Sequence, residues 1–204
     1  MPTAGDALFP RPCAGCDAPD GPWCASCASR LGVRLVPAVE GIRWFAAVAP
    51  YDGAAGRALR RAKYGTDRAT MVVLAAAFAD HAAPLAVGHD AIVPVPSPVG
   101  RRVARGFAPA AVFARALSER SGVPVASALR LSPGPRQAGL DAAGRSRNLV
   151  GRLRAVRDVP GRVLLVDDVV TTGTTLAAAA RELLGGQARR VDAVVWCAAD
   201  RNTR

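Results

Sequence analysis

The feature that most constrains the fold is a run near the C-terminal end, residues 163–175, with the sequence VLLVDDVVTTGTT. Its first four residues are apolar and predict a buried strand, at whose carboxyl end Asp167 and Asp168 stand side by side. Four threonines and Gly173 follow, and they lead directly into a predicted helix. This order of strand, polar loop and helix is typical of parallel α/β sheets, in which ligands bind beyond the carboxyl ends of the strands.

The loop and the two carboxylates offer groups for different parts of one ligand. Threonine hydroxyls, a flexible glycine and the free N–H groups of a helix start form a cradle that suits phosphate. Two adjacent carboxylates can hold sugar hydroxyls, or can meet them through a hydrated Mg²⁺. The chain contains neither GxxxxGK[ST] nor GxGxxG, so it lacks the motifs of P-loop nucleotide hydrolases and of Rossmann dehydrogenases. The run therefore predicts a site for a phosphorylated sugar.

The rest of the chain alternates short apolar strands with helices. Strands are predicted over 42–49, 91–95, 162–166 and 191–198, and helices over 52–64, 71–83, 109–121 and 174–184. Residues 132–147 carry no regular pattern and predict a long arginine-bearing loop of the kind that is usually functional. Half of the residues are hydrophobic, which is enough for a core. We therefore expect an α/β fold with a parallel sheet and helices on both faces.

Four of the five cysteines form two pairs, Cys13-x2-Cys16 and Cys24-x2-Cys27. Thiolates two residues apart can grip one cation, and two such pairs complete a tetrahedral shell of four sulfurs. A filled shell favours a structural zinc, while an iron–sulfur cluster and a pair of disulfides are the alternatives by ligand type. We expect a small four-cysteine zinc-binding module, a zinc knuckle, in residues 1–36, followed by one domain in residues 37–204.

The positive charge is concentrated in one segment of the chain. The net charge is +11, and residues 101–162 hold thirteen arginines against three acidic residues. The other 142 residues are nearly neutral, with 14 basic and 13 acidic side chains. This concentration favours an anionic partner, either a phosphate-bearing ligand or nucleic acid, over a uniformly solubilising surface.

Residues 163–175 resemble the motif with which type I phosphoribosyltransferases bind phosphoribosyl pyrophosphate (PRPP). The resemblance implies that the acid pair, Asp167 and Asp168, contacts the ribose hydroxyls and is catalytic. It also implies that residues 171–175 bind the 5′-phosphate. The PRPP-binding residues implied in the run are Asp167, Asp168, Val169, Val170, Thr171, Thr172, Gly173, Thr174 and Thr175.

Further motifs narrow the resemblance to one family. They are Tyr51-Asp52-Gly53, Lys63-Tyr64-Gly65, Val93-Pro94-Val95-Pro96, Arg105-Gly106-Phe107, Arg136-Gln137-Ala138-Gly139-Leu140 and Arg145-Ser146-Arg147-Asn148-Leu149. Together with the cysteine pairs, this succession is similar to the ComF family of competence proteins, which includes GntX-like proteins. The chain departs from that pattern where Ala108 and Pro109 stand in place of Asn-Gln.

The family resemblance also suggests roles for arginines. Arg101 and Arg102 follow the strand after which type I enzymes place their pyrophosphate loop, so they are expected to contact pyrophosphate. Arg105 is expected to act in catalysis by clamping the departing pyrophosphate. Residues 136–147 resemble a flexible catalytic hood.

Two functions follow as expectations. The first is a PRPP-binding protein that uses Mg²⁺ and transfers the phosphoribosyl group to an acceptor with release of pyrophosphate. The second is a non-enzymatic competence protein that acts in DNA uptake with single-stranded DNA and a helicase-like ATPase as partners. The sequence leaves enzyme status open but favours the transferase, and it is compatible with an oligomer.

The start of the chain predicts a cytoplasmic location without membrane insertion. Residues 1–12 show no basic segment followed by an apolar one, as a signal peptide would. The best candidate for a membrane span, residues 71–87, is interrupted by Asp80, His81 and Pro84.

Overall fold

The computed structural model describes residues 11–132 and 151–199. Its centre is a five-stranded sheet in the order β1-β2-β7-β6-β3. The strands are β1 (Arg34–Leu35), β2 (Phe45–Pro50), β7 (Ala188–Ala198), β6 (Gly161–Val170) and β3 (Ala91–Pro94). The last four run parallel, and only the short β1 pairs antiparallel with its neighbour. The expected α/β fold with a mostly parallel sheet is thereby confirmed.

Strand β6 lies in the interior of the sheet, between β7 and β3, and both of its faces are covered. Leu164 and Val166 pack into one hydrophobic cluster, and Val163 and Leu165 pack into the other. All four side chains are fully buried, because successive residues of a strand point to opposite faces. A continuous apolar run is what a strand buried on both faces requires.

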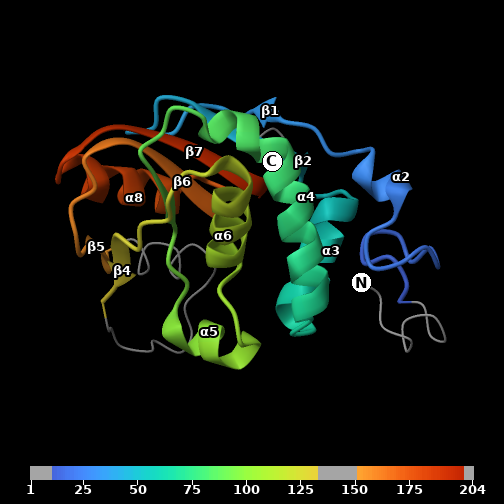
Figure 1. Cartoon of the computed structure of the whole chain (residues 1–204). Coiled ribbons are helices and arrows are strands. Elements are labelled where there is room, and N and C mark those ends of the chain that lie inside the picture. The colour runs from blue at the N-terminus through green and yellow to red at the C-terminus, as the bar shows by residue number, and fades with distance from the viewer. Residues whose placement is uncertain (1–10, 133–150, 200–204) are drawn as a thin grey trace.

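Three helices cover the first face, α3 (Ala54–Tyr64), α4 (Arg68–Ala86) and α6 (Pro109–Ser121), as Figure 1 shows. Their shared core is aromatic at its centre, although the chain is poor in aromatics. Phe113 stacks on Trp196 of β7 with ring centroids 5.7 Å apart, and it also meets Phe78 at 4.9 Å. Small alanines around these rings let the helices approach the sheet closely.

The second face is covered by α8 (Thr174–Leu184) and by a two-stranded hairpin. The hairpin pairs β4 (Leu129–Leu131) with β5 (Leu153–Ala155) in antiparallel register. Leu176 and Leu183 of α8 pack with Leu153 and the inner residues of the sheet. Helices therefore lie on both faces of the sheet, as expected.

Several element bounds differ from those predicted. Strand β6 extends beyond residue 166 to Val170, because it stays paired with β7 as far as Ala198. A short helix, α5 (Val99–Arg105), occupies a stretch for which no element was predicted; it has only seven residues and none of them is buried. Most of the predicted irregular loop at 132–147 lies outside the described residues.

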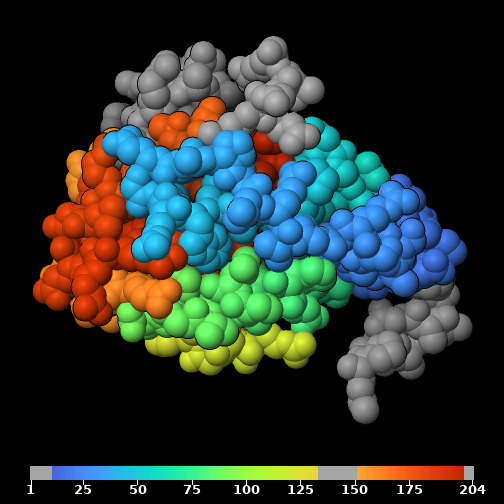
Figure 2. Space-filling model, turned by 90° about the horizontal axis from the view of Figure 1, so that it is seen from above, coloured from blue at the N-terminus to red at the C-terminus, as the bar shows by residue number. Residues whose placement is uncertain are grey.

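The N-terminal segment, with the short helix α2 (Ala25–Ala28), forms a projection at one end of the molecule (Figure 2). It lies beside the cyan segment that contains α3, as both views show. In the part of the chain that is described, α4 alone is long and apolar enough to cross a membrane by length and composition. In this fold one side of the helix, with Met71, Leu74 and Phe78, is buried in the core, while Val72 is exposed.

Candidate functional site

The acid pair lies in the last third of β6, near the carboxyl end of the parallel sheet. Both carboxylates are half-buried, in contrast to the fully buried Leu165 and Val166 just before them. The backbone N–H of Asp168 donates a hydrogen bond of 2.8 Å to Oδ1 of Asp167. The sheet therefore fixes two adjacent carboxylates at the edge where ligands of parallel α/β proteins bind.

Asp168 forms an ion pair with the one lysine of the chain. Nζ of Lys63, at the end of α3, lies 2.7 Å from Oδ1 of Asp168. Both side chains are mostly buried, with Lys63 14% exposed and Asp168 15% exposed. A pair this sheltered is screened less by solvent than a surface pair, so it holds the Asp168 side chain in a defined place.

Asp167 has a different electrostatic environment. Burial and the neighbouring charge of Asp168 raise the pKa of Asp167 to about 8, although the Asp168 N–H and the Lys63 ammonium act in the opposite direction. Burial therefore favours the protonated form of Asp167 beside Asp168. Such a pair can donate one hydrogen bond and accept others, which suits a diol of a sugar.

The threonine loop, residues 171–175, connects β6 to α8. Gly173 has φ +81°, a left-handed conformation that favours glycine, and it directly precedes the first helical residue. The hydroxyl groups of Thr172 and Thr174 form a hydrogen bond of 2.7 Å, and both residues are exposed. Gly173 has no side chain to cap helix α8, and the N–H of Thr174, its first residue, donates to the Thr172 hydroxyl at 3.4 Å. The loop thus has the backbone and hydroxyl donors that an anion needs.

Not every residue of the predicted run faces this loop. Val170 is 4% exposed and packs into the core beneath α8, so its side chain does not face a ligand at the loop. Val169 is half-buried against the opposite cluster. A cavity of about 300 Å³ opens beside the loop and is lined by Ala38, Val39, Glu40, Thr172, Gly173, Thr174, Ala177, Ala178 and Arg181.

The three arginines that we singled out lie together on α5, after β3. Arg101 and Arg102 are exposed, and Arg102 lines a cavity of about 260 Å³ between α5, the end of β3 and the hairpin. Arg105 is half-buried, and its guanidinium lies over the ring of Tyr64, 5.5 Å from the centroid. Tyr64 directly follows Lys63, so the end of α3 contacts both Asp168 and Arg105. The roomiest described cavity, about 410 Å³ between α4 and α6, contains none of these groups.

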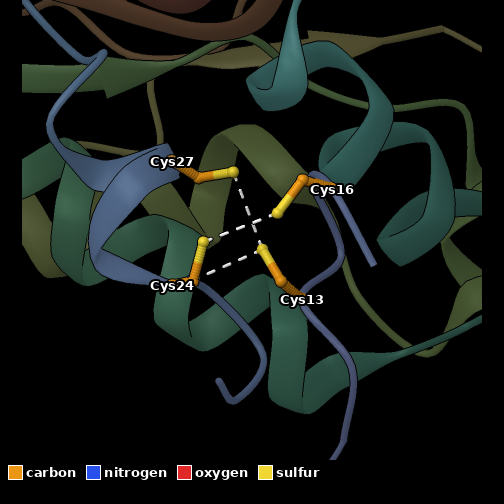
Figure 3. A group of neighbouring side chains, drawn as sticks. All are labelled: Cys13, Cys16, Cys24 and Cys27. Carbon is orange, nitrogen blue, oxygen red and sulfur yellow. Dashed lines mark hydrogen bonds between the residues drawn. The ribbon is translucent and has the colours of Figure 1, made fainter. Parts of the chain in front are cut away.

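The four cysteines of the N-terminal segment come together as the spacing predicts (Figure 3). We call residues 13–28 the cysteine module. All four Sγ atoms lie within 4.8 Å of one another; Cys13 and Cys27 are 3.7 Å apart, and Cys16 and Cys24 are 3.6 Å apart. Thiolates about 2.3 Å from a tetrahedral Zn²⁺ would lie about 3.8 Å from one another, so the cluster fits this ion.

The local backbone prepares one of these thiols for a cation. Burial opposes ionisation of Cys13, but the backbone N–H groups of Cys24 and Gly15, each 3.4 Å from its sulfur, lower its pKa to about 6. A thiolate is the form that binds a metal. The fifth cysteine, Cys197, is fully buried in β7, and burial raises the pKa of its thiol to about 12.

Comparison with known families agrees with this geometry. A model of the phosphoribosyl transferase domain matches residues 90–204, more than half of the chain. The chain belongs to the phosphoribosyl transferase domain family. The matched region contains β3, α5, the acid pair and the threonine loop, while the cysteine module and α3 precede it.

Two solved structures resemble part of the chain. The glutamine PRPP amidotransferase from B. subtilis, complexed with ADP and GMP, is 25% identical with a TM-score of 0.44; the match covers 61% of this chain and 25% of that one. The orotate phosphoribosyltransferase from Aeropyrum pernix is 21% identical with a TM-score of 0.40, over 66% and 62%. This chain spans about a quarter of the amidotransferase. No curated protein sequence matches the chain.

Sequence reasoning singled out the Lys63-Tyr64-Gly65 motif without placing it. The structure brings Lys63 to the acid pair and Tyr64 to Arg105. The sequence signal for a role of Lys63 at the site is that it is the single lysine among 27 basic residues and that it begins the Lys63-Tyr64-Gly65 motif.

Proposed function

We propose that the chain binds PRPP at the acid pair and the threonine loop, and transfers its phosphoribosyl group to an acceptor with release of pyrophosphate. One observation carries this proposal. In a member of the phosphoribosyl transferase domain family, the interior strand β6 carries two carboxylates near its carboxyl end, and a glycine-containing threonine loop at a helix start follows two residues later. Sugar and phosphate groups of one ligand find complementary groups along this short stretch of chain.

The acid pair would hold the ribose. Asp168, fixed by Lys63, accepts a hydrogen bond from one ribose hydroxyl, and the protonated Asp167 donates one to an oxygen of the same diol. As the bond from C1 to pyrophosphate breaks, positive charge develops on the ribose. The carboxylate of Asp168 stabilises that charge, because it is preorganised and sheltered from water.

The two ends of the substrate would be held by separate elements. The N–H groups and hydroxyls of residues 171–175 bind the 5′-phosphate. Arg101, Arg102 and Arg105 on α5 bind the pyrophosphate, for which the guanidinium fork is suited. Mg²⁺ would neutralise the pyrophosphate as it leaves, and the carboxylate of Asp168 together with the ligand's own oxygens supplies the hard donors that this ion prefers.

Thermal unfolding in the presence of ligands tests this proposal. PRPP should raise the melting temperature in a concentration-dependent way, and more so with Mg²⁺, because a ligand that binds only the folded state stabilises it. Ribose 5-phosphate and pyrophosphate should each give a smaller shift, since each fills part of the site. Equal shifts with PRPP and pyrophosphate would contradict the proposal and indicate a general anion site.

A second function is favoured by the charge distribution. Residues 101–162 carry thirteen arginines, and Arg101 and Arg102 are exposed on α5. We propose single-stranded DNA, handled with a helicase-like ATPase in DNA uptake, as the alternative partner that the ComF resemblance implies. Binding to DNA would weaken steeply as salt rises from about 50 to about 200 mM, whereas binding of PRPP would depend on Mg²⁺. The two salt and metal profiles distinguish the functions.

The cysteine module would hold a structural zinc, for which its four sulfurs are spaced. Membership of the ComF family, a cytoplasmic location and a boundary between two units at residues 36 and 37 complete the proposal. They are carried by the motifs and the cysteine pairs quoted from the sequence.

A further inference from the structure

Helix α3 contacts the cysteine module with one face and the phosphoribosyl site with another. We propose that the metal-loaded cysteine module positions Lys63 on Asp168 through this helix, so that metal occupancy sets the state of the ligand site. The consequence for PRPP rests on the proposed function, whereas the effect on Lys63 does not.

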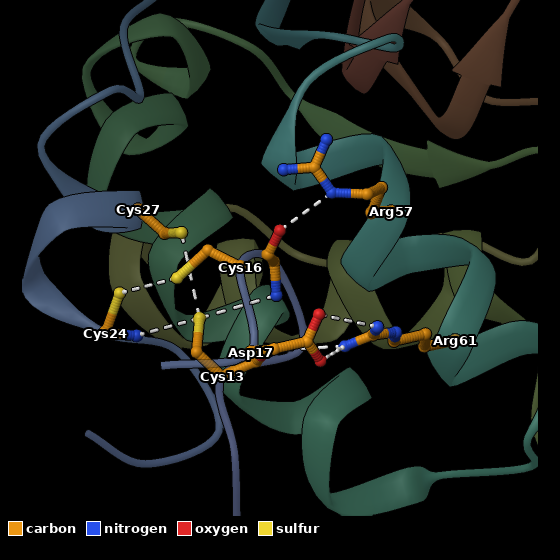
Figure 4. Close-up of polar contacts among 8 residues, drawn as sticks. Cys13, Cys16, Asp17, Cys24, Cys27, Arg57 and Arg61 are labelled. Atoms are coloured by element: carbon orange, nitrogen blue, oxygen red, sulfur yellow. Dashed lines mark hydrogen bonds and ion pairs between the residues drawn. The ribbon is translucent and has the colours of Figure 1, made fainter. Parts of the chain in front are cut away.

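The first half of the connection consists of two arginines on α3 (Figure 4). Nε of Arg57 donates a hydrogen bond of 2.9 Å to the carbonyl oxygen of Gly15. Arg61 binds both carboxylate oxygens of Asp17, at 2.6 and 3.1 Å, and its Nη1 also lies 3.4 Å from the carbonyl oxygen of Cys13. These backbone and side-chain partners lie between or beside the metal-binding cysteines, so their placement depends on the cluster.

Close packing accompanies these polar contacts. A Cβ atom on Gly15 would lie 2.8 Å from the Trp23 ring and 3.0 Å from both Ala54 and the sulfur of Cys27. The module therefore touches the first residue of α3 with no space to spare. An exposed ion pair such as Arg61–Asp17 contributes little by itself, but with the Arg57 contact and this packing it fixes where the helix lies.

The second half of the connection is the end of the same helix. Lys63 follows Arg61 by two residues, a rotation of about 200° around an α-helix, so the two side chains leave α3 on nearly opposite sides. Nζ of Lys63 lies 2.7 Å from Oδ1 of Asp168, and the guanidinium of Arg105 lies over the ring of Tyr64. Arg57 and Lys63 are separated by about 9 Å along the axis, a short rigid span.

The helix is held as a rigid element between these two ends. A Cβ on Gly56 would overlap the carbonyl oxygen of Tyr51, so the first turn of α3 packs tightly against the preceding loop. The indole N–H of Trp196 donates a hydrogen bond of 3.1 Å to the carbonyl oxygen of Ala55. The first turn of α3 therefore does not deform by itself, so a displacement caused by the cysteine module would move α3 as one unit, Lys63 included.

The uniqueness of Lys63 provides a direct measurement. An amine-selective acylating reagent can modify only Lys63 and the N-terminal amine, and mass spectrometry of Arg-specific peptides reports each rate separately. In the zinc-loaded protein, Lys63 should react slowly because it is paired and sheltered. Asp168→Asn, which removes the carboxylate, gives the rate of an unpaired Lys63, and the N-terminal amine is the internal reference.

Removal of zinc by a chelator should raise the Lys63 rate at least threefold, toward that of Asp168→Asn. A second variant keeps all four cysteines but breaks the contacts, namely Arg57→Gln combined with Asp17→Gly. Glycine suits this position because Asp17 has φ +65°. This double variant should retain its zinc and still show the faster Lys63 reaction. Arg60→Gln is the matched control on α3, because the Arg60 guanidinium lies over Tyr51 instead.

An unchanged Lys63 rate in the zinc-loaded double variant would overturn the proposal. So would an equal acceleration in Arg60→Gln, because the effect would then come from any charge removed from α3. The same double variant should bind PRPP at least threefold more weakly, and unchanged PRPP affinity would refute the effect on the ligand site. If the wild-type protein does not bind PRPP, the proposed function fails, while the acylation rates still decide the connection through α3.

Discussion

The two neighbouring carboxylates of the acid pair differ in their partners more than in their positions. Asp168 faces the ammonium group of Lys63, whereas Asp167 accepts a backbone N–H and is otherwise deprived of water. The difference assigns the charged role to Asp168 and the protonated role to Asp167. In the proposed function, the two residues would therefore hold one ribose diol from its donor and acceptor sides.

Single replacements by asparagine should separate these roles. Asp168→Asn removes a charge-assisted acceptor and should lower PRPP affinity about 10- to 100-fold at pH 7. Asp167→Asn replaces a protonated carboxyl group by a neutral group of the same shape, so it should lower affinity by less than about threefold. Calorimetric titration measures both. Equal losses in the two variants would contradict the different protonation states.

The protonation of Asp167 also predicts how stability depends on pH. An unfolded aspartate loses its proton at about pH 3.9, whereas folded Asp167 keeps it to about pH 8. Between these values the folded state binds more protons, so this residue's contribution to the free energy of unfolding falls as pH rises, by at most about 1.4 kcal/mol per unit. Denaturant unfolding from pH 4 to 8 should show a flatter profile for Asp167→Asn than for the wild type. Identical profiles would refute the raised pKa.

At the scale of elements, the packing of helix α3 depends on the close approach of Gly56 to the carbonyl group of Tyr51. Gly56→Ala places a methyl carbon against the carbonyl oxygen of Tyr51, so it should lower the free energy of unfolding by about 1–3 kcal/mol, although alanine favours helices. Gly53→Ala is the matched control, because its Cβ would meet Pro50 at an ordinary 3.6 Å. Denaturant titration compares the two variants. A Gly56→Ala protein as stable as the control would show that the helix can shift.

Elements with clear local signals were predictable at their exact ends. Helix α6 spans Pro109–Ser121 and α8 spans Thr174–Leu184, as predicted, since a proline starts the first and Gly122, with φ +76°, ends it. Strand β6 was predicted too short, because hydrogen bonding to β7 carries it past the acid pair. That extension is a property of the pairing and has no local sequence signal.

The candidate site was predictable where its residues adjoin in the chain. The acid pair and the threonine loop lie in one run, and the four cysteines lie within 15 residues, so both groupings could be seen in the sequence. The pairing of Lys63 with Asp168 joins residues far apart in the chain, and it depends on how α3 packs on the sheet. No periodicity or spacing encodes such a contact.

At the scale of the whole molecule, the cysteine module is joined to the main core. Trp23 meets Trp196 of β7 edge to face with centroids 6.1 Å apart, and Ala14 is buried in the same cluster as the helices of the first face. Loss of the metal should therefore lower the stability of the main core as well as that of the cysteine module.

We expect one zinc ion per chain, and a lower melting temperature when one of the four cysteines that bind it is replaced. Cys24→Ser should lose the zinc and several degrees of melting temperature, because a structural metal contributes folding free energy. Cys197→Ala, a buried cysteine outside the cluster, should keep the full zinc content. Metal analysis and calorimetric unfolding measure both quantities. Full zinc content in Cys24→Ser would show that this thiol is not a ligand.

The central claim is that PRPP binds at the acid pair of β6. Calorimetric titration of the wild-type protein and of Asp167→Ala combined with Asp168→Ala, with and without Mg²⁺, tests it most directly. We predict Mg²⁺-dependent binding of PRPP to the wild type and no measurable binding to the folded double variant. Equal affinity in both proteins would place PRPP elsewhere and contradict this claim.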